Sequence, residues 1–183
     1  MSCFPDPVMN IVKENLDTFY WVEKEIDPKL RETGRKTVKA FGVGSRFVHF
    51  ECFRLEKARK GLGKKGDYVG LEVNMRPAGG YTPDMMDYAH STDVYKIWAD
   101  MVAFNECRTG QGEQYFCAYA GRRDNKTYVH SHDEIIEKYG PSLAKVDRMP
   151  KALASALSDM AYMAKLDTRE QMQEFFAFVG ATK

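Results

Sequence analysis

Two hydrophobic, β-prone runs separated by a polar segment form the clearest pattern in this chain. The first run covers residues 47–55, and the second ends at Arg76. Between them lies Lys57–Gly66, a lysine- and glycine-rich segment of the kind that connects the strands of a hairpin. The pattern therefore predicts a β-hairpin in the first half of the chain.

The second strand of this hairpin places three polar side chains together. Successive side chains of a strand point to opposite faces, so Glu72, Asn74 and Arg76 are expected on one face. The strand then continues into Pro77–Gly80, whose backbone can approach a ligand closely. A solvent-exposed hairpin face often carries such residues without any function, and this interpretation stays open beside a functional one.

The first strand of the hairpin adds a further carboxylate, Glu51. If the hairpin is symmetric and Glu56 pairs with Asp67, Glu51 lies directly opposite Glu72. Two carboxylates that face each other across a ladder repel unless a cation lies between them. With the amide oxygen of Asn74 they form the kind of oxygen donor set that Mg²⁺ uses when it also binds phosphates. These residues predict a metal–nucleotide site.

Helical periodicity and capping residues predict the other elements. Helices are expected at residues 28–40, 83–88, 94–101, 131–139, 150–160 and 168–179. Further strands are expected at residues 115–120, 127–129, 142–149 and 161–166, the first two forming a second hairpin. Helices and strands do not alternate regularly, so the predicted fold class is α+β, with an antiparallel sheet flanked by helices.

Composition narrows the classes of function. The chain has 183 residues, 44% of them hydrophobic, and a net charge of +1. This length is sufficient for a real core, and the charge gives no reason to expect nucleic acid or a membrane as a partner. No apolar run approaches the roughly 20 residues of a membrane span, and the N-terminus lacks a signal pattern. Four scattered cysteines without zinc-site spacing favour reduced thiols and a cytoplasmic protein.

The two strands of the hairpin also carry a resemblance to a known family. At Phe50–Phe53 and at Glu72–Arg76, which reads E-x-N-x-R, the sequence resembles the ATP-grasp superfamily. The longer run Glu72–Ala103 is similar to bacterial ATP-grasp proteins related to the carbamoyl phosphate synthetase large subunit. The resemblance implies the C-terminal part of an ATP-grasp fold, with residues 1–106 as its C-terminal lobe and residues 107–183 as an α/β extension packed on it.

This resemblance implies a reaction and a set of site residues. ATP-grasp ligases phosphorylate a carboxylate with ATP and pass the acyl phosphate to an amine or another nucleophile. By resemblance Glu51, Glu72 and Asn74 bind Mg²⁺ (or Mn²⁺) against the ATP phosphates, and Arg76 is the catalytic residue that holds the substrate or the phosphorylated species. A loop that shapes the acceptor pocket would comprise Gly79, Gly80, Tyr81 and Thr82.

Other parts of a complete ATP-grasp enzyme are not recognisable in the sequence. No segment before Phe47 resembles the N-terminal domain, or the small lobe whose lysines and glycine-rich loop cover the nucleotide. We therefore interpret the chain as the metal-binding half of a ligase, with ATP, a carboxylate substrate and the missing N-terminal lobe as its partners. The alternative is a truncated, non-catalytic module that binds a small molecule or a partner. RNA binding through the basic segment Lys57–Lys65 is a third, weaker hypothesis.

Five further side chains are candidates for a site. Asp84, Asp87 and His90 follow the glycine loop and could contact a substrate, with capping or solvation of a short helix as the favoured interpretation. His130 and His132 have a spacing that could serve a metal, with a surface turn as the favoured interpretation.

Overall fold

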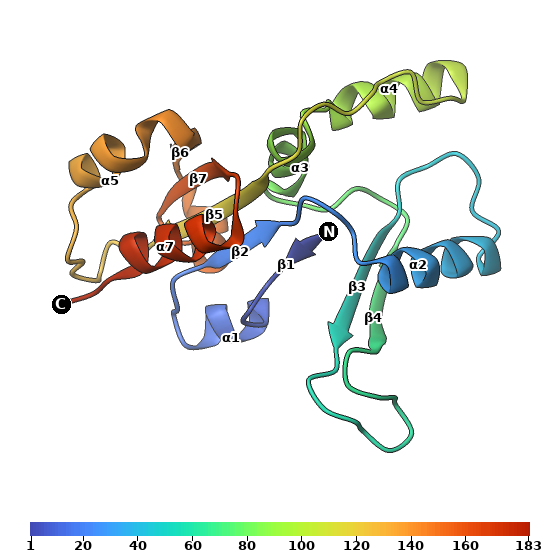
Figure 1. Cartoon of the computed structure of the whole chain (residues 1–183), viewed down its shortest axis with the longest axis horizontal. Coiled ribbons are helices and arrows are strands. Elements are labelled where there is room, and N and C mark those ends of the chain that lie inside the picture. Colours follow the sequence, from blue (N-terminus) through green and yellow to red (C-terminus); the bar gives the residue numbers. More distant parts are fainter. The chain divides into compact units, whose positions relative to one another are not determined.

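The computed structural model describes all residues 1–183, which form two compact units (Figure 1). The first unit comprises residues 1–25, 84–92 and 111–183, and the second comprises residues 26–83 and 93–110. This division differs from the expected boundary after residue 106. Residues 1–25 join residues 111–183 because an N-terminal strand pairs with the sheet that the C-terminal residues form.

A five-stranded antiparallel sheet lies at the centre of the first unit. The strand order is β1-β2-β5-β7-β6, so β2, β5 and β7 have a neighbour on each side. The strands are β1 (Ser2–Cys3), β2 (Phe19–Val22), β5 (Phe116–Arg122), β6 (Leu143–Arg148) and β7 (Met160–Leu166). Side chains on both faces of β5 and β7 are buried, which makes these two strands the core of the unit.

Helices complete the first unit. They are α1 (Val8–Lys13), α5 (His132–Tyr139), α6 (Lys151–Leu157), α7 (Arg169–Gly180) and a single 3₁₀ turn at Gly140–Ser142. Phe175 of α7 and Tyr139 of α5 pack on the same sheet face as Ala118 and Ala164, whose small side chains allow a close approach. Helix α3 (Thr82–His90) contributes its residues from Asp84 onward to this unit. None of the helices combines the length and the apolar composition that a membrane crossing requires.

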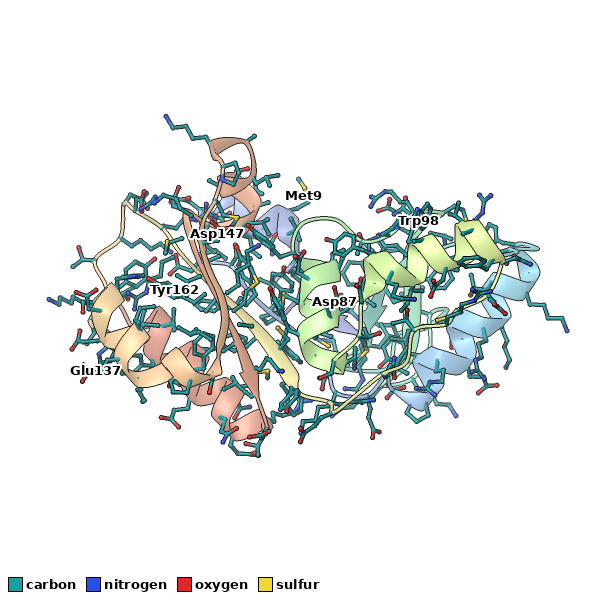
Figure 2. The ribbon with its side chains drawn as sticks, turned by 90° about the horizontal axis from the view of Figure 1, so that it is seen from above. Met9, Asp87, Trp98, Glu137, Asp147 and Tyr162 are labelled. Atoms are coloured by element: carbon teal, nitrogen blue, oxygen red, sulfur yellow. The ribbon has the colours of Figure 1, made fainter.

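The second unit contains the predicted hairpin and two longer helices. Strands β3 (His49–Arg54) and β4 (Tyr68–Asn74) form a two-stranded antiparallel sheet, beside α2 (Pro28–Ala40) and α4 (Val94–Phe104). Gly34 of α2 lies against the ring of Phe50, where a Cβ atom would be 3.6 Å from the ring. The Phe47 ring stacks on Trp98 of α4, with 5.6 Å between the ring centroids. Trp98 remains half exposed (Figure 2).

Helix starts predicted from capping residues are confirmed. The Asp27 carboxylate accepts hydrogen bonds from the first turn of α2, and the Asp93 carboxylate does the same for α4. Ser131 and Thr168 each form a capping box, with Glu134 and Gln171 respectively. These signals are local, because the side chain satisfies backbone N–H groups within three residues.

The predicted second hairpin is wrong. Residues 127–129 form no strand, and Tyr128 makes only an isolated bridge to Thr182. Strand β5 instead pairs with β2 and β7, two strands far away in the sequence. The helix expected over residues 150–160 ends at Leu157, since Met160 already belongs to β7. Elements β1, α1 and β2 were not expected at all.

Candidate functional site

The two carboxylates of the hairpin lie opposite each other, as the sequence predicts. Glu51 of β3 is the register partner of Glu72 of β4, and His49 is the partner of Asn74. Opposed residues in an antiparallel pair point to the same face, and so do residues two apart in one strand. His49, Glu51, Glu72 and Asn74 therefore share one face of the hairpin.

A β-bulge produces this register. Near the connecting loop the backbone pairs Leu55 with Asp67, so the expected pairing of Glu56 with Asp67 is wrong by one residue. Continued regularly, this pairing would bring Glu51 opposite Leu71. The irregularity between Glu51 and Cys52 inserts Leu71 as an extra residue in β4, and Glu72 then meets Glu51.

The contacts of these side chains leave both carboxylates without a Lys or Arg partner. Asn74 Nδ2 donates a hydrogen bond of 2.7 Å to Glu72 Oε1. His49 Nε2 lies 3.7 Å from Glu51 Oε1. Because the amide nitrogen of Asn74 is directed at Glu72, its amide oxygen stays available as an acceptor or a metal ligand. Two facing carboxylates with no Lys or Arg between them are the main electrostatic feature of this face.

The chemistry of this donor set fits a hard divalent cation. Two carboxylates and an amide oxygen are ligands of the kind that Mg²⁺ takes, together with waters and substrate phosphates. No three His, Cys, Asp or Glu side chains of the structure lie close enough together to hold a metal ion. The hairpin thus offers an open, partial ligand set rather than a closed cage, and metal binding by Glu51, Glu72 and Asn74 stays a prediction.

Arg76 and the loop after it lie beyond the end of β4. The strand ends at Asn74, and Arg76 Nη1 donates a hydrogen bond of 2.9 Å to the carbonyl oxygen of Pro77. Gly80 has a φ of +60°, a conformation that favours glycine. Thr82 is buried and is the first residue of α3, while Tyr81 is half-buried. The roles expected for Arg76, Gly79, Gly80, Tyr81 and Thr82 stay predictions.

The remaining candidate side chains do not form a common site. His132 Nδ1 lies 2.9 Å from the hydroxyl of Tyr162, whereas the His130 ring stacks on Phe178 with 3.6 Å between the centroids. These two histidines therefore have separate partners in the core. His90 lies in α3, where burial lowers the pKa of its imidazole.

Asp84 and Asp87 also lie on α3, and the Asp87 carbonyl accepts a hydrogen bond from the backbone of Thr92 (Figure 2). Sequence reasoning missed His49 as a member of the hairpin site. Its distance of two residues from Glu51 was the signal that could have identified it, because such residues share a face.

Comparisons with known proteins bear on the fold. No protein-family model and no curated protein matches the sequence. The structure is similar to the crystal structure of phosphoribosylglycinamide synthetase from Anaerococcus prevotii, with a TM-score of 0.58 and 12% sequence identity. The likeness covers 88% of this chain and 43% of that chain, so this chain spans less than half the length of the synthetase.

This likeness confirms the predicted fold class. The chain has antiparallel sheets flanked by helices, and its fold is similar to that of part of the synthetase chain. At 12% identity the likeness shows the fold alone. The finer similarity to the carbamoyl phosphate synthetase large subunit is not specifically supported by it.

Proposed function

We propose that this chain is the metal- and phosphate-binding part of an ATP-dependent ligase that joins a carboxylate to an amine through an acyl phosphate. One observation carries the proposal: Glu51 and Glu72 face each other beside Asn74, with no Lys or Arg pairing with either carboxylate. The ATP-grasp-like fold supports the same reading, as does the resemblance of Glu72–Ala103 to carbamoyl phosphate synthetase-like proteins.

The proposed chemistry follows from charge. When Mg²⁺ or Mn²⁺ is bound, it neutralises the β- and γ-phosphates of ATP during phosphoryl transfer. Glu51, Glu72 and Asn74 would hold that ion on the hairpin face. Arg76 would turn from the Pro77 carbonyl to grip the substrate carboxylate, because a guanidinium binds a carboxylate through two parallel hydrogen bonds. The loop of Gly79–Thr82 would form the wall of the acceptor pocket. The partners would be ATP, the carboxylate substrate and an N-terminal ATP-grasp lobe, in a cytoplasmic setting.

The second candidate function is a non-catalytic module that binds a partner or a small molecule. The exposed apolar side chains of the second unit favour it, among them Leu71 of β4 and Val102 and Phe104 of α4. Such a module would need no divalent ion at the hairpin. The two functions therefore differ in whether nucleotide binding depends on Mg²⁺ and on Glu72.

Calorimetric titration of Mg-ATP tests the proposal. We expect weak binding to the wild-type chain that disappears when EDTA removes the metal. Glu72→Gln keeps the size of the side chain and removes its charge, and it should weaken binding by about tenfold or more, since a charged contact contributes about 1.5–3 kcal/mol. Glu56→Gln is the matched control, because Glu56 lies just beyond the hairpin strands and is exposed. Equal heats from all three proteins would contradict the proposal.

A further inference from the structure

A cavity of about 440 Å³ lies in the first unit, where the ends of β5 and β6 and the start of β7 meet. Its size falls within the range of small-molecule sites. Four cationic side chains line it against a single carboxylate: Arg122, Arg123, Lys126 and Arg148, with Asp124. None of these residues belongs to the hairpin, so the cavity is independent of the proposed metal site.

Two of the four cations already have an acidic partner. Arg148 binds the Asp124 carboxylate through two hydrogen bonds, of 2.6 and 3.0 Å. Lys126 Nζ lies 3.1 Å from Oδ1 of Asp17, which also accepts a hydrogen bond of 2.8 Å from the Tyr128 hydroxyl. These pairs leave Arg122 and Arg123 as the cations of the cavity wall without a carboxylate in contact.

Arg123 is satisfied by backbone carbonyl groups. Its guanidinium donates to the carbonyl oxygen of Leu16 at 2.9 and 3.0 Å, to that of Ser155 at 2.8 Å, and to that of Ala154. Although only 4% exposed, this side chain has a partner for each of its nitrogen atoms. It therefore connects the end of β5 to helix α6 and to the segment before β2, and its charge adds to the positive potential there.

Unlike Arg123, Arg122 has one guanidinium nitrogen without a hydrogen-bond partner. It is 7% exposed, and it donates from Nε to the carbonyl of Val179 and from Nη1 to the carbonyl of His130, both at 2.7 Å. Its Nη2 is buried and has no hydrogen-bond partner. A guanidinium stays charged in proteins, and a buried donor without an acceptor is costly, so this nitrogen calls for an acceptor.

Aromatic side chains form the rest of the wall. The Arg122 guanidinium lies 4.3 Å from the centroid of the Tyr128 ring and 5.9 Å from that of the Tyr162 ring. Tyr162 extends from β7 (Figure 2), and its hydroxyl lies 2.9 Å from Nδ1 of His132. The cavity thus combines an unsatisfied cationic donor with flat apolar surfaces, and such a combination suits an anion carried on a ring.

We propose that this cavity binds a small organic anion, with a phosphate or carboxylate group directed at Arg122 and a ring-sized body against Tyr128 and Tyr162. The anion supplies the acceptor that Nη2 lacks. Arg148 and Lys126 add attraction at the cavity wall. The nearby acidic groups Asp17 and Asp124 are paired with Lys126 and Arg148. Asp159 and Glu134 also lie nearby, but they accept hydrogen bonds from the backbone of Asp124 and Ser131. Arg122 is therefore left without a carboxylate in contact.

Titration with simple probes tests this site. Phenyl phosphate and benzoate carry the two anionic groups on the same ring, and benzyl alcohol is the neutral control. In nuclear magnetic resonance spectra we expect both anions, or the one whose head group fits, to shift the side-chain signal of Arg122 saturably. Benzyl alcohol should leave that signal unchanged. No shift with either anion, or an equal shift with benzyl alcohol, would overturn the proposal, since a buried water would then be the partner of Nη2.

Variants locate the binding in the cavity. Arg122→Lys removes the unsatisfied donor and should weaken binding of the better anion by about tenfold, because charged hydrogen bonds contribute about 1.5–3 kcal/mol. As Arg122 also supports the fold, Arg148→Gln is the second variant, exposed at the cavity wall and expected to weaken binding less. Lys13→Gln makes the same change of charge on the exposed face of α1 and should have no effect. Equal affinities in Arg148→Gln and Lys13→Gln would count against the cavity as the site.

Discussion

The first unit buries its apolar side chains between a five-stranded sheet and its helices, whereas the second unit has a two-stranded sheet and leaves many apolar side chains exposed. Phe175 in the first unit is fully buried, while Phe53 of β3 is 51% exposed and Val102 of α4 is 71% exposed. An isolated two-stranded hairpin is at best marginally stable in water. The proposed metal site therefore lies on the less densely packed unit, whereas the buried apolar core belongs to the first unit.

This difference has a chemical reason. In the second unit, two of the few buried side chains are the polar Thr82 and Asp100. Asp100 accepts hydrogen bonds from Lys96 Nζ at 2.8 and 3.0 Å and from the backbone of Arg108 and the hydroxyl of Thr109. Polar contacts of this kind, rather than a large apolar core, fix the end of α4. The end of α4 is thus held by polar contacts within residues 96–109.

Removal of one aromatic ring from each unit should give the largest contrast. Phe175→Ala creates a cavity in the core of the first unit and should lower the free energy of unfolding by about 3–5 kcal/mol. Phe53→Ala changes a half-exposed ring on β3 and should have an effect within about 0.5 kcal/mol. Denaturant titrations of both variants measure these values. Similar losses in the two variants would mean that the units are packed alike.

Ion pairs should show the same contrast on a smaller scale. Glu23 is almost fully buried, and it accepts hydrogen bonds from Arg169 at 2.7 and 2.8 Å and from the Trp21 indole at 2.8 Å. Glu23→Ala should cost about 2 kcal/mol, the usual range for charged hydrogen bonds. The exposed pair of Glu32 and Lys36 on α2 is the comparison in the second unit, and Glu32→Ala should cost much less, because solvent screens an exposed ion pair. Thermal unfolding of both variants shows which substitution costs more stability. A larger loss of stability in Glu32→Ala than in Glu23→Ala would contradict the prediction.

Acid should loosen α4 through Asp100. The hydrogen bond from Lys96 is the largest cause that lowers the pKa of the Asp100 carboxyl, followed by bonds from Arg108 and Thr109. A carboxyl whose pKa is lower in the folded state stabilises that state fully above its ordinary pKa, and this contribution is lost as the pH falls toward the folded pKa. The protection factors of the α4 amides, which compare each exchange rate with the intrinsic rate at the same pH, should therefore fall as the pH falls from about 5 to 3.

The control for this pH effect is Asp100→Asn, which cannot titrate. Exchange in α4 of this variant should be faster at neutral pH, because an amide binds Lys96 more weakly than a carboxylate does. Its protection factors should also depend less on pH than those of the wild-type chain. An unchanged pH dependence in the variant would show that another group is responsible.

A small effect of the opposite sign is expected at the facing carboxylates. Without a metal, Glu72→Gln removes the repulsion between residues 51 and 72 and should stabilise the hairpin by about 0.2–1 kcal/mol. Protection of the β3 and β4 amides against exchange would report this gain. The same variant should lose any stabilisation by Mg²⁺. A hairpin that becomes less protected without metal would mean that Glu72 contributes a favourable contact instead.

Local features of the fold could be predicted from the sequence, whereas long-range pairing could not. Four helix starts are predictable because an N-cap side chain binds the backbone of the first turn that follows it. These N-cap residues are Asp27, Asp93, Ser131 and Thr168. By contrast, β2 pairs with β5 about a hundred residues later, and no local pattern specifies that partner. The apolar run Phe19–Val22 signals only that a segment is buried.

The candidate site likewise has a part that local sequence rules predict and a part that they do not. Alternation along β4 is a local rule, and it correctly places Glu72 and Asn74 on one face, whereas Glu51 joins them only through the register between the strands. The bulge at Leu71 was not predictable, because an extra residue in one strand leaves no clear mark in the sequence. Two offsets, one at the hairpin tip and one at the bulge, compensate each other in the final register. The sequence did not identify Arg122 as a candidate binding residue, because its burial and its hydrogen-bond partner Val179 depend on contacts between distant segments.

The central claim is that the facing carboxylates of the hairpin bind a divalent ion, and paramagnetic Mn²⁺ tests it most directly. Substoichiometric Mn²⁺ with ATP should broaden the amide signals of Glu51, Glu72 and Asn74 before any others in the nuclear magnetic resonance spectrum. In Glu72→Gln these signals should stay sharp under the same conditions. Broadening that is equal in both proteins, or that is centred on another part of the chain, would contradict the account.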